Sequence, residues 1–148
     1  MVFQAAFRIL GSAEDAEDVA QDVFLEMFSR ADIDQIKNWG ACLRRLTIYR
    51  ALDRRRKRRG IVGIGSNEFP TAALSPVDEA IQRELADRMR DLIAGLPERE
   101  GAVFAIRYLE GLSNPQIAEV LEISSGAVAV ALHRVRSKLE AAAKEPTE

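Results

Sequence analysis

The chain has 148 residues, a formal net charge of −2 at pH 7 and 47% hydrophobic residues, with aromatic residues making up only 6%. This length suits one compact domain or two small helical ones, and no apolar run approaches the roughly 20 residues that span a bilayer, so no membrane insertion is expected. A lone cysteine, Cys42, excludes an internal disulfide and fits a cytoplasmic protein without a signal peptide; we expect it to be a small buried apolar residue.

The charges are unevenly distributed. Six acidic residues and no basic one lie between Glu14 and Glu26, whereas nine basic residues and one acid lie between Arg44 and Arg59. Like charges packed this densely repel one another unless a polyanion is near. The pattern therefore predicts an acidic surface for a basic partner and a separate basic surface for phosphate.

Helical signals begin at the N-terminus. Residues 1–10 are apolar and helix-like, Gly11 is placed to end that helix, and Ser12 to cap the next. Apolar residues then follow with helical spacing to about residue 30 and predict an inward stripe, at Ala16, Val19, Ala20, Val23, Phe24, Met27 and Phe28. Residues 31–37 lack this periodicity and are expected to form a loop.

A second long helix is expected from about residue 38 to residue 59. Its predicted buried stripe comprises Trp39, Leu43, Leu46, Tyr49 or Arg50, and Leu52. Its C-terminal end is the run RRRKRR, where cations also suit the helix dipole. Residues 60–74, with three glycines and a proline, predict a flexible linker.

Beyond the linker, Ser75 and Pro76 predict a helix start. The residues expected to face inward on this helix are Val77, Ile81, Leu85, Met89, Leu92 and Ile93. A turn at residues 95–97 leads to another helix, which ends near Gly111. The predicted fold is therefore all-α, with two small helical domains and a second unit of four helices.

Residues 112–139 carry the most informative pattern. Ser113 and Gln116 predict a capping box for a short helix, and Ser124 caps a further helix after a tight turn. Small Ala118 lies where the two helices cross, and the apolar residues between them predict a shared core. This is the pattern of a helix-turn-helix, whose second helix enters the major groove of DNA.

Three segments in order resemble the extracytoplasmic-function branch of the sigma-70 transcription initiation factors. They are LGSAEDAEDVAQDVFLEMF at 10–28, ALDRRRKRR at 51–59, and LPEREGAVFAIRYLEGLSNPQIAEVLEISSGAVAVALHRVRSKL at 96–139. The resemblance implies that residues 1–59 form sigma region 2, that 60–74 form the linker, and that 75–148 form sigma region 4. Compared with the family's usual first helix, the chain is expected to be N-terminally shortened.

The resemblance also assigns contacts. Binding to core RNA polymerase falls on Glu14, Glu17, Asp18, Gln21, Asp22 and Leu25. Capture of the promoter's minus-ten element falls on Asp34, Lys37, Asn38, Arg44, Arg45, Arg50, Arg54 and Arg55. Reading of the minus-thirty-five element falls on Ser124, Ser125, Ala127, Ala129, Val130, His133, Arg134 and Arg136. An anti-sigma factor is left open as a further partner, and the free chain is expected to be a monomer.

The sequence departs from the family pattern at informative positions. Glu122 replaces the glycine usual in the helix-turn-helix turn, at a cost on the order of 1 kcal/mol in a left-handed conformation. Ala129 and Ala131 stand where Lys and Arg are common, and alanine cannot hydrogen-bond a base edge. We therefore expect relaxed discrimination at the minus-thirty-five element, with phosphates and DNA shape supplying more of the binding.

Two other functions remain open at this stage: a dimeric helix-turn-helix regulator, and a sigma-like interaction protein that does not initiate transcription. An enzyme is not expected, because the only histidine, His133, lacks a nucleophile or metal-ligand partner in the sequence. No cofactor or metal is expected either, since Gly63 and Gly65 lack the strand and helix of a dinucleotide loop. Trp39 is expected in the core rather than on a base-stacking surface.

Overall fold

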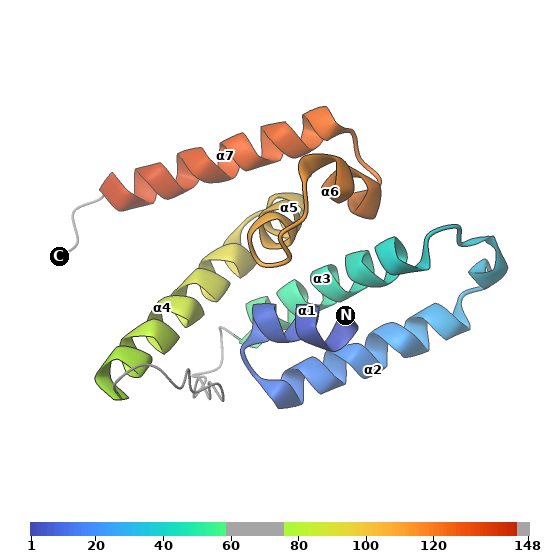
Figure 1. The fold of residues 1–148 in the computed structure, drawn as a ribbon, viewed down its shortest axis with the longest axis horizontal. Coiled ribbons are helices and arrows are strands. Elements are labelled where there is room, and N and C mark those ends of the chain that lie inside the picture. The colour runs from blue at the N-terminus through green and yellow to red at the C-terminus, as the bar shows by residue number, and fades with distance from the viewer. Residues whose placement is uncertain (59–75, 145–148) are drawn as a thin grey trace.

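The computed structural model describes residues 1–58 and 76–144, with side chains to residue 142. Within these ranges the chain forms seven α-helices and no strand, as predicted (Figure 1). A short 3-10 helix lies within residues 31–37, where a loop was expected. The predicted linker at 60–74 and the predicted cap at Ser75 lie outside the described residues.

The first unit contains α1 (Val2–Leu10), α2 (Ala13–Ser29), the 3-10 helix η1 (Ile33–Gln35) and α3 (Trp39–Arg58). Gly11 ends α1 in the left-handed conformation with φ 71°, which a residue without a Cβ adopts at little cost. Ser12 then caps α2, accepting a hydrogen bond from the Asp15 N–H at 3.3 Å. Both local predictions are confirmed.

The second unit contains α4 (Pro76–Gly95), α5 (Glu98–Tyr108), α6 (Asn114–Leu121) and α7 (Ser125–Lys144). Ser113 and Gln116 form the predicted capping box at the start of α6. Ser124 caps α7 by accepting a hydrogen bond from the Ala127 N–H at 3.0 Å. The axes of α6 and α7 differ by 106°, within the range typical of a helix-turn-helix.

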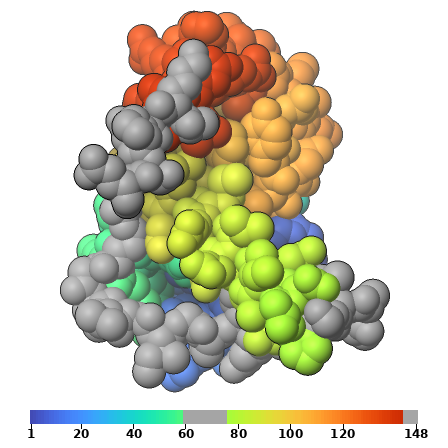
Figure 2. Space-filling model, turned by 90° about the vertical axis from the view of Figure 1, so that its left-hand side faces the viewer, coloured from blue at the N-terminus to red at the C-terminus, as the bar shows by residue number. Residues whose placement is uncertain are grey.

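The two units share one apolar core, and α3 lies at its centre. This helix contacts α1 and α2 on one side and α4, α5 and α6 on the other (Figure 1). The buried cluster runs without interruption from Ile9 and Val23 through Ile48 and Leu52 to Ile106. A side view shows the second unit stacked on the first, with α7 on the outside (Figure 2).

The central position of α3 changes its predicted buried stripe. Trp39 is 40% exposed, so its predicted place in the core is wrong. Of the alternatives Tyr49 and Arg50, Tyr49 packs against the core and Arg50 is exposed. The other predicted positions are confirmed, since Leu43 and Leu46 pack against the core and Leu52 is buried. The fully buried positions also include Thr47 and Ile48, which the prediction omitted. Because α3 packs on two sides, burial extends around the helix instead of following one stripe.

The prediction for α4 is wrong for most of its length. Ile93 is buried, but Val77, Ile81, Leu85, Met89 and Leu92 are between 38% and 69% exposed. The opposite, polar face of α4 packs on the first unit, where Arg90 Nε donates to the Arg8 carbonyl at 2.8 Å. Charge-assisted hydrogen bonds to the first unit thus orient this helix, and its apolar stripe faces outward.

No single helix among the described residues is long and apolar enough to cross a membrane. The pair Asn114–Leu121 and Ser125–Ala142 meets the length and composition threshold only when the two bent helices are taken together.

Candidate protein and nucleic-acid interfaces

The acidic face of α2 is exposed. All six residues predicted for polymerase binding are on the surface: Glu14, Glu17, Asp18, Gln21, Asp22 and Leu25. Leu25 and Phe28 are each 70% exposed and Phe24 is 43% exposed, so the inward placement predicted for both phenylalanines is wrong. With Ala16, Val19, Val23 and Met27 already buried, the remaining large apolar residues of α2 fall on its outer side. The result is an apolar patch beside an acidic surface.

Asp15 differs from the other acids of α2. It is 3% exposed, and its two carboxylate oxygens accept from Arg54 at 3.0 Å and Arg58 at 2.9 Å. Arg54 also pairs with Asp18 at 3.0 Å. The start of α2 and the end of α3 are therefore joined by ion pairs, a role for Asp15 that its position in the acidic run did not indicate.

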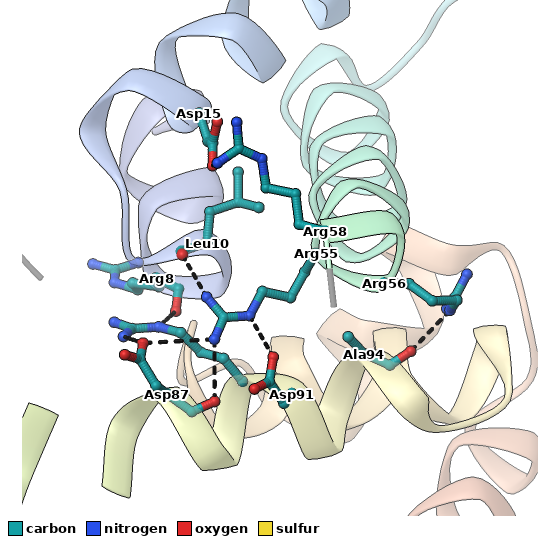
Figure 3. A network of polar contacts seen from close by, with 10 residues as sticks. Arg8, Leu10, Asp15, Arg55, Arg56, Arg58, Asp87, Asp91 and Ala94 are labelled. Carbon is teal, nitrogen blue, oxygen red and sulfur yellow. Dashed lines mark hydrogen bonds and ion pairs between the residues drawn. The ribbon is translucent and has the colours of Figure 1, made fainter. Parts of the chain in front are cut away.

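Arg55 joins the two units. Its guanidinium donates to the Leu10 carbonyl at 2.8 Å, to the Asp87 carbonyl at 3.2 Å and to the Asp91 carboxylate at 2.8 Å (Figure 3). Its neighbour Arg56 donates to the Ala94 carbonyl at 2.9 Å. The arginine run thus has partners within the chain, and the proposed contacts of Arg54 and Arg55 with DNA stay predictions.

The predicted minus-ten residues do not form one cluster. Arg44 lies 3.6 Å from the nearly buried carboxylate of Glu110, which also pairs with Arg8. Arg50 pairs with Glu26 at 2.8 Å on the surface, which raises the pKa of the Arg50 guanidinium further. Three further predicted residues, Lys37, Asn38 and Arg45, line a cavity near the start of α3.

This cavity has a volume of about 350 Å³ and lies between the two units. The first unit contributes Arg30, Asp32, Gln35, Ile36, Lys37, Asn38, Ala41, Cys42 and Arg45, and the second contributes Glu119 and Glu122. Lys37, Asn38 and Arg45 were predicted, whereas Asp34 does not line it. The two glutamates were not predicted as site residues, although Glu122 had been noted as an unusual residue for the turn.

Arg30 contacts two other residues that line the cavity, Asp32 and Cys42. Arg30 forms a bidentate ion pair with Asp32, in which both hydrogen bonds are 2.9 Å long. This hydrogen bonding lowers the pKa of Asp32 and raises the pKa of Arg30. Arg30 also donates to the Cys42 sulfur at 3.3 Å, and that sulfur lies 3.5 Å from Met27 Sδ. Cys42 is 5% exposed, which confirms its predicted burial.

The outer face of α7 presents most of the residues predicted to read DNA. Ser124, Ser125, Ala129, Val130, His133, Arg134 and Arg136 are exposed, and Ala127 is partly buried. Ala131, by contrast, is 4% exposed and packs in the core with Val128 and Val135. Its predicted position at the DNA surface is wrong, because positions 128, 131 and 135 form the inward stripe of the helix. Ala129 alone keeps the outward position.

Lys138, unlike Arg134 and Arg136 of α7, has an acidic partner among the described residues. Its ammonium donates to both carboxylate oxygens of Glu100, at 3.1 and 3.2 Å, and Glu100 is 8% exposed. This pair ties α7 to α5, so Lys138 stabilises the helix-turn-helix unit.

Two family comparisons match separate parts of the chain. Sigma-70 region 2 matches residues 1–61, and the sigma-70 region 4 family matches residues 86–139. These matches fall on the first unit and on the helix-turn-helix unit. The chain therefore belongs to the sigma-70 family of transcription initiation factors.

Its relatives narrow this assignment to the extracytoplasmic-function branch. ECF RNA polymerase sigma factor SigW of Bacillus subtilis is 27% identical over 93% of the chain and 80% of the relative. ECF RNA polymerase sigma factor SigE of Mycolicibacterium smegmatis is 29% identical over 93% of the chain, which spans 55% of that relative. RNA polymerase sigma-E factor of Streptomyces coelicolor is 29% identical over 93% of the chain and 77% of the relative.

Proposed function

We propose that this sigma factor binds core RNA polymerase through the outer face of α2. The observation that carries the proposal is the exposed pair Leu25 and Phe28, each 70% exposed, beside Glu17 and Asp22. Large apolar residues surrounded by charge are typical of the centre of a protein interface. The acids suit a basic partner and speed its association.

The minus-ten element is proposed to bind at the loop before α3 and in the cavity beside it. Unstacked bases need a pocket together with nearby cations, because stacking and phosphate neutralisation offset the cost of unpairing. Lys37, Asn38 and Arg45 line the cavity, and Trp39 is 40% exposed beside them in sequence. An exposed indole at this place is available for stacking on a base.

The minus-thirty-five element is proposed to bind along α7. Its exposed face combines His133, Arg134 and Arg136 with the small residues Gly126 and Ala129. Small residues permit a close approach to the groove while the cations contact phosphates. Joining two DNA-reading units in one chain makes the spacing between the two promoter elements part of the specificity.

The proposed activity is binding without catalysis by the chain itself, in the cytoplasm, with strand opening driven by binding energy. Among the described residues, no group of three or more His, Cys, Asp or Glu side chains is arranged to hold a metal ion. The free chain is proposed to be a monomer.

The test pairs polymerase binding with run-off transcription. We expect Leu25→Asp and Phe28→Asp each to weaken binding to core polymerase by about tenfold or more, as truncating a central interface residue commonly does. The matched control is Val77→Asp, because Val77 is 69% exposed and lies on the other unit. Full-strength binding by both α2 variants would contradict the assignment.

Run-off transcription from a genomic promoter library then separates initiation from binding alone. Specific transcripts with the wild-type chain are expected. Retained core binding without any specific transcript would instead favour a sigma-like interaction protein, and dimers on paired half-sites would favour a conventional regulator.

A further inference from the structure

The cavity proposed to hold minus-ten bases is covered by the second unit of the same chain. Asn38 Nδ2 donates to Glu119 Oε1 at 2.6 Å. Arg45 Nη1 donates to the Val120 carbonyl at 3.0 Å and pairs with Glu122 Oε1 at 3.2 Å. The end of α6 therefore occupies two of the donors that the cavity would offer to DNA, Asn38 and Arg45.

The chemistry of the cover resembles that of the proposed ligand. Arg30, Lys37 and Arg45 give the cavity its cations, and the second unit supplies two carboxylates. A phosphate needs the same donors, and carboxylates at the rim repel it. The cover and a nucleic acid strand thus compete for the same side chains.

The backbone of Glu122 adopts an unusual conformation at the edge of the cavity. It ends α6 in the left-handed conformation, with φ 57° and ψ 46°, and it is the only described non-glycine residue with positive φ. Such a conformation costs a residue with a side chain on the order of 1 kcal/mol compared with glycine. The side chain of Glu122 is 74% exposed, so it is not held by packing. Its contact with the first unit is the ion pair with Arg45.

Two other cations predicted for the minus-ten region also pair with acids of the second unit. Arg44 faces Glu110, and Arg55 is bound by Asp87 and Asp91, all from the second unit. The engagement extends along α3 from its first turns to its last. The interface between the units therefore overlaps part of the predicted DNA surface of α3, whereas Arg50 and Arg54 pair with acids of the first unit.

We propose that the second unit is a built-in competitor for the minus-ten strand, with Glu119 and Glu122 as the groups that cover the cavity. This inference rests on the proposed use of the cavity for DNA. In the arrangement described here single-stranded DNA is excluded, and it gains access when α6 separates from the start of α3. Removing the two carboxylates shifts the chain toward the open form.

Cys42 provides a reporter of opening that does not depend on DNA. It is the only cysteine in the chain, it lines the cavity, and it is 5% exposed in the covered form. Its reaction with an aromatic disulfide reagent such as DTNB therefore measures access of the reagent to the cavity.

The variants are Glu119→Ala, Glu122→Gly and their combination, made in the full chain. The matched control is Glu84→Ala, which removes the same charge from an exposed position paired only along α4 with Arg88. Each single variant is expected to react about threefold faster at Cys42, and the double variant about tenfold faster. Glu122→Gly keeps or raises the midpoint of denaturant unfolding, because it also relieves the left-handed strain.

A fluorescein-labelled single-stranded oligodeoxynucleotide of mixed sequence then serves as the binding probe. Tighter binding by the same factors, with the control unchanged, supports the competition. Equal thiol rates and equal affinities across the variants overturn it. Faster thiol reaction without tighter DNA binding also overturns it, since the cover would then not compete with nucleic acid.

Failure of the proposed function has a different signature. If wild type and variants alike direct no transcription with core polymerase, the initiation role fails whatever the thiol rates are. If the wild type initiates transcription while the variants behave identically in both assays, the function stands and the competition fails.

Discussion

Two basic regions of this molecule look alike in the sequence and differ in the structure. The run at the end of α3 is the denser one, yet Arg54, Arg55, Arg56 and Arg58 all bind partners within the chain. On α7, Arg134 and Arg136 are exposed and pair with no other described residue. Charge density along a sequence therefore does not locate the free cations of a fold, because acceptors from distant segments claim some of them.

The largest expected effect of this difference is on stability. Arg55→Ala removes a guanidinium that is 16% exposed and leaves the Leu10 and Asp87 carbonyls without a donor they have now. We expect the free energy of unfolding to fall by about 2–3 kcal/mol, measured by urea denaturation.

Arg136→Ala is the matched control for this loss, with an expected change within about 0.5 kcal/mol. Similar losses in the free energy of unfolding for the two variants would show that the contacts of Arg55 contribute little to stability. The two basic regions would then differ in their contacts but not in their contribution to stability.

A smaller effect is expected at Lys138, the α7 cation with an internal partner. Lys138→Ala leaves the nearly buried side chain of Glu100 without its ammonium donor. The free energy of unfolding is expected to fall by about 1–2 kcal/mol. The double variant Lys138→Ala, Glu100→Gln should recover part of this loss, and no recovery would mean that packing rather than charge accounts for it.

The smallest expected effect on stability, but a clear effect on binding, belongs to the free arginines of α7. Arg134→Ala and Arg136→Ala are each expected to reduce the slope of log affinity against log salt by about 0.9, the loss of one phosphate contact. Titration of a mixed-sequence duplex at several salt concentrations measures this. An unchanged slope for both variants would remove α7 from the DNA surface.

Local signals in the sequence predicted local structure well. The left-handed Gly11, the cap at Ser12 and the capping box of Ser113 and Gln116 each depend on a few neighbouring residues. Backbone hydrogen bonding at helix ends is a short-range matter, so a short stretch of sequence is enough to predict it. The helix-turn-helix was predictable for the same reason.

Predictions that depended on which helix packs where were less successful. An apolar stripe on α4 predicts an inward face, but Arg55 and Arg90 bind its polar side to the first unit. Ala131 was expected on the outward face of α7 but lies on the inward face. Neighbouring positions on a helix differ by about 100° of rotation, so a small error in assigning the faces moves a residue from one to the other. The covering of the cavity by Glu119 joins residues 81 positions apart, and no local pattern contains that information.

Gly101 gives the junction of the two units an unusual sensitivity to a single methyl group. A Cβ at this position would lie 2.9 Å from the Ile93 carbonyl and 3.7 Å from Leu52 Cδ1, so three helices meet where glycine leaves room. An alanine here would act as a wedge, pushing the last turn of α4 outward and carrying with it the Ala94 carbonyl that anchors Arg56. The smallest change in side-chain size at residue 101 would thus loosen the packing of α4 and α5 against α3.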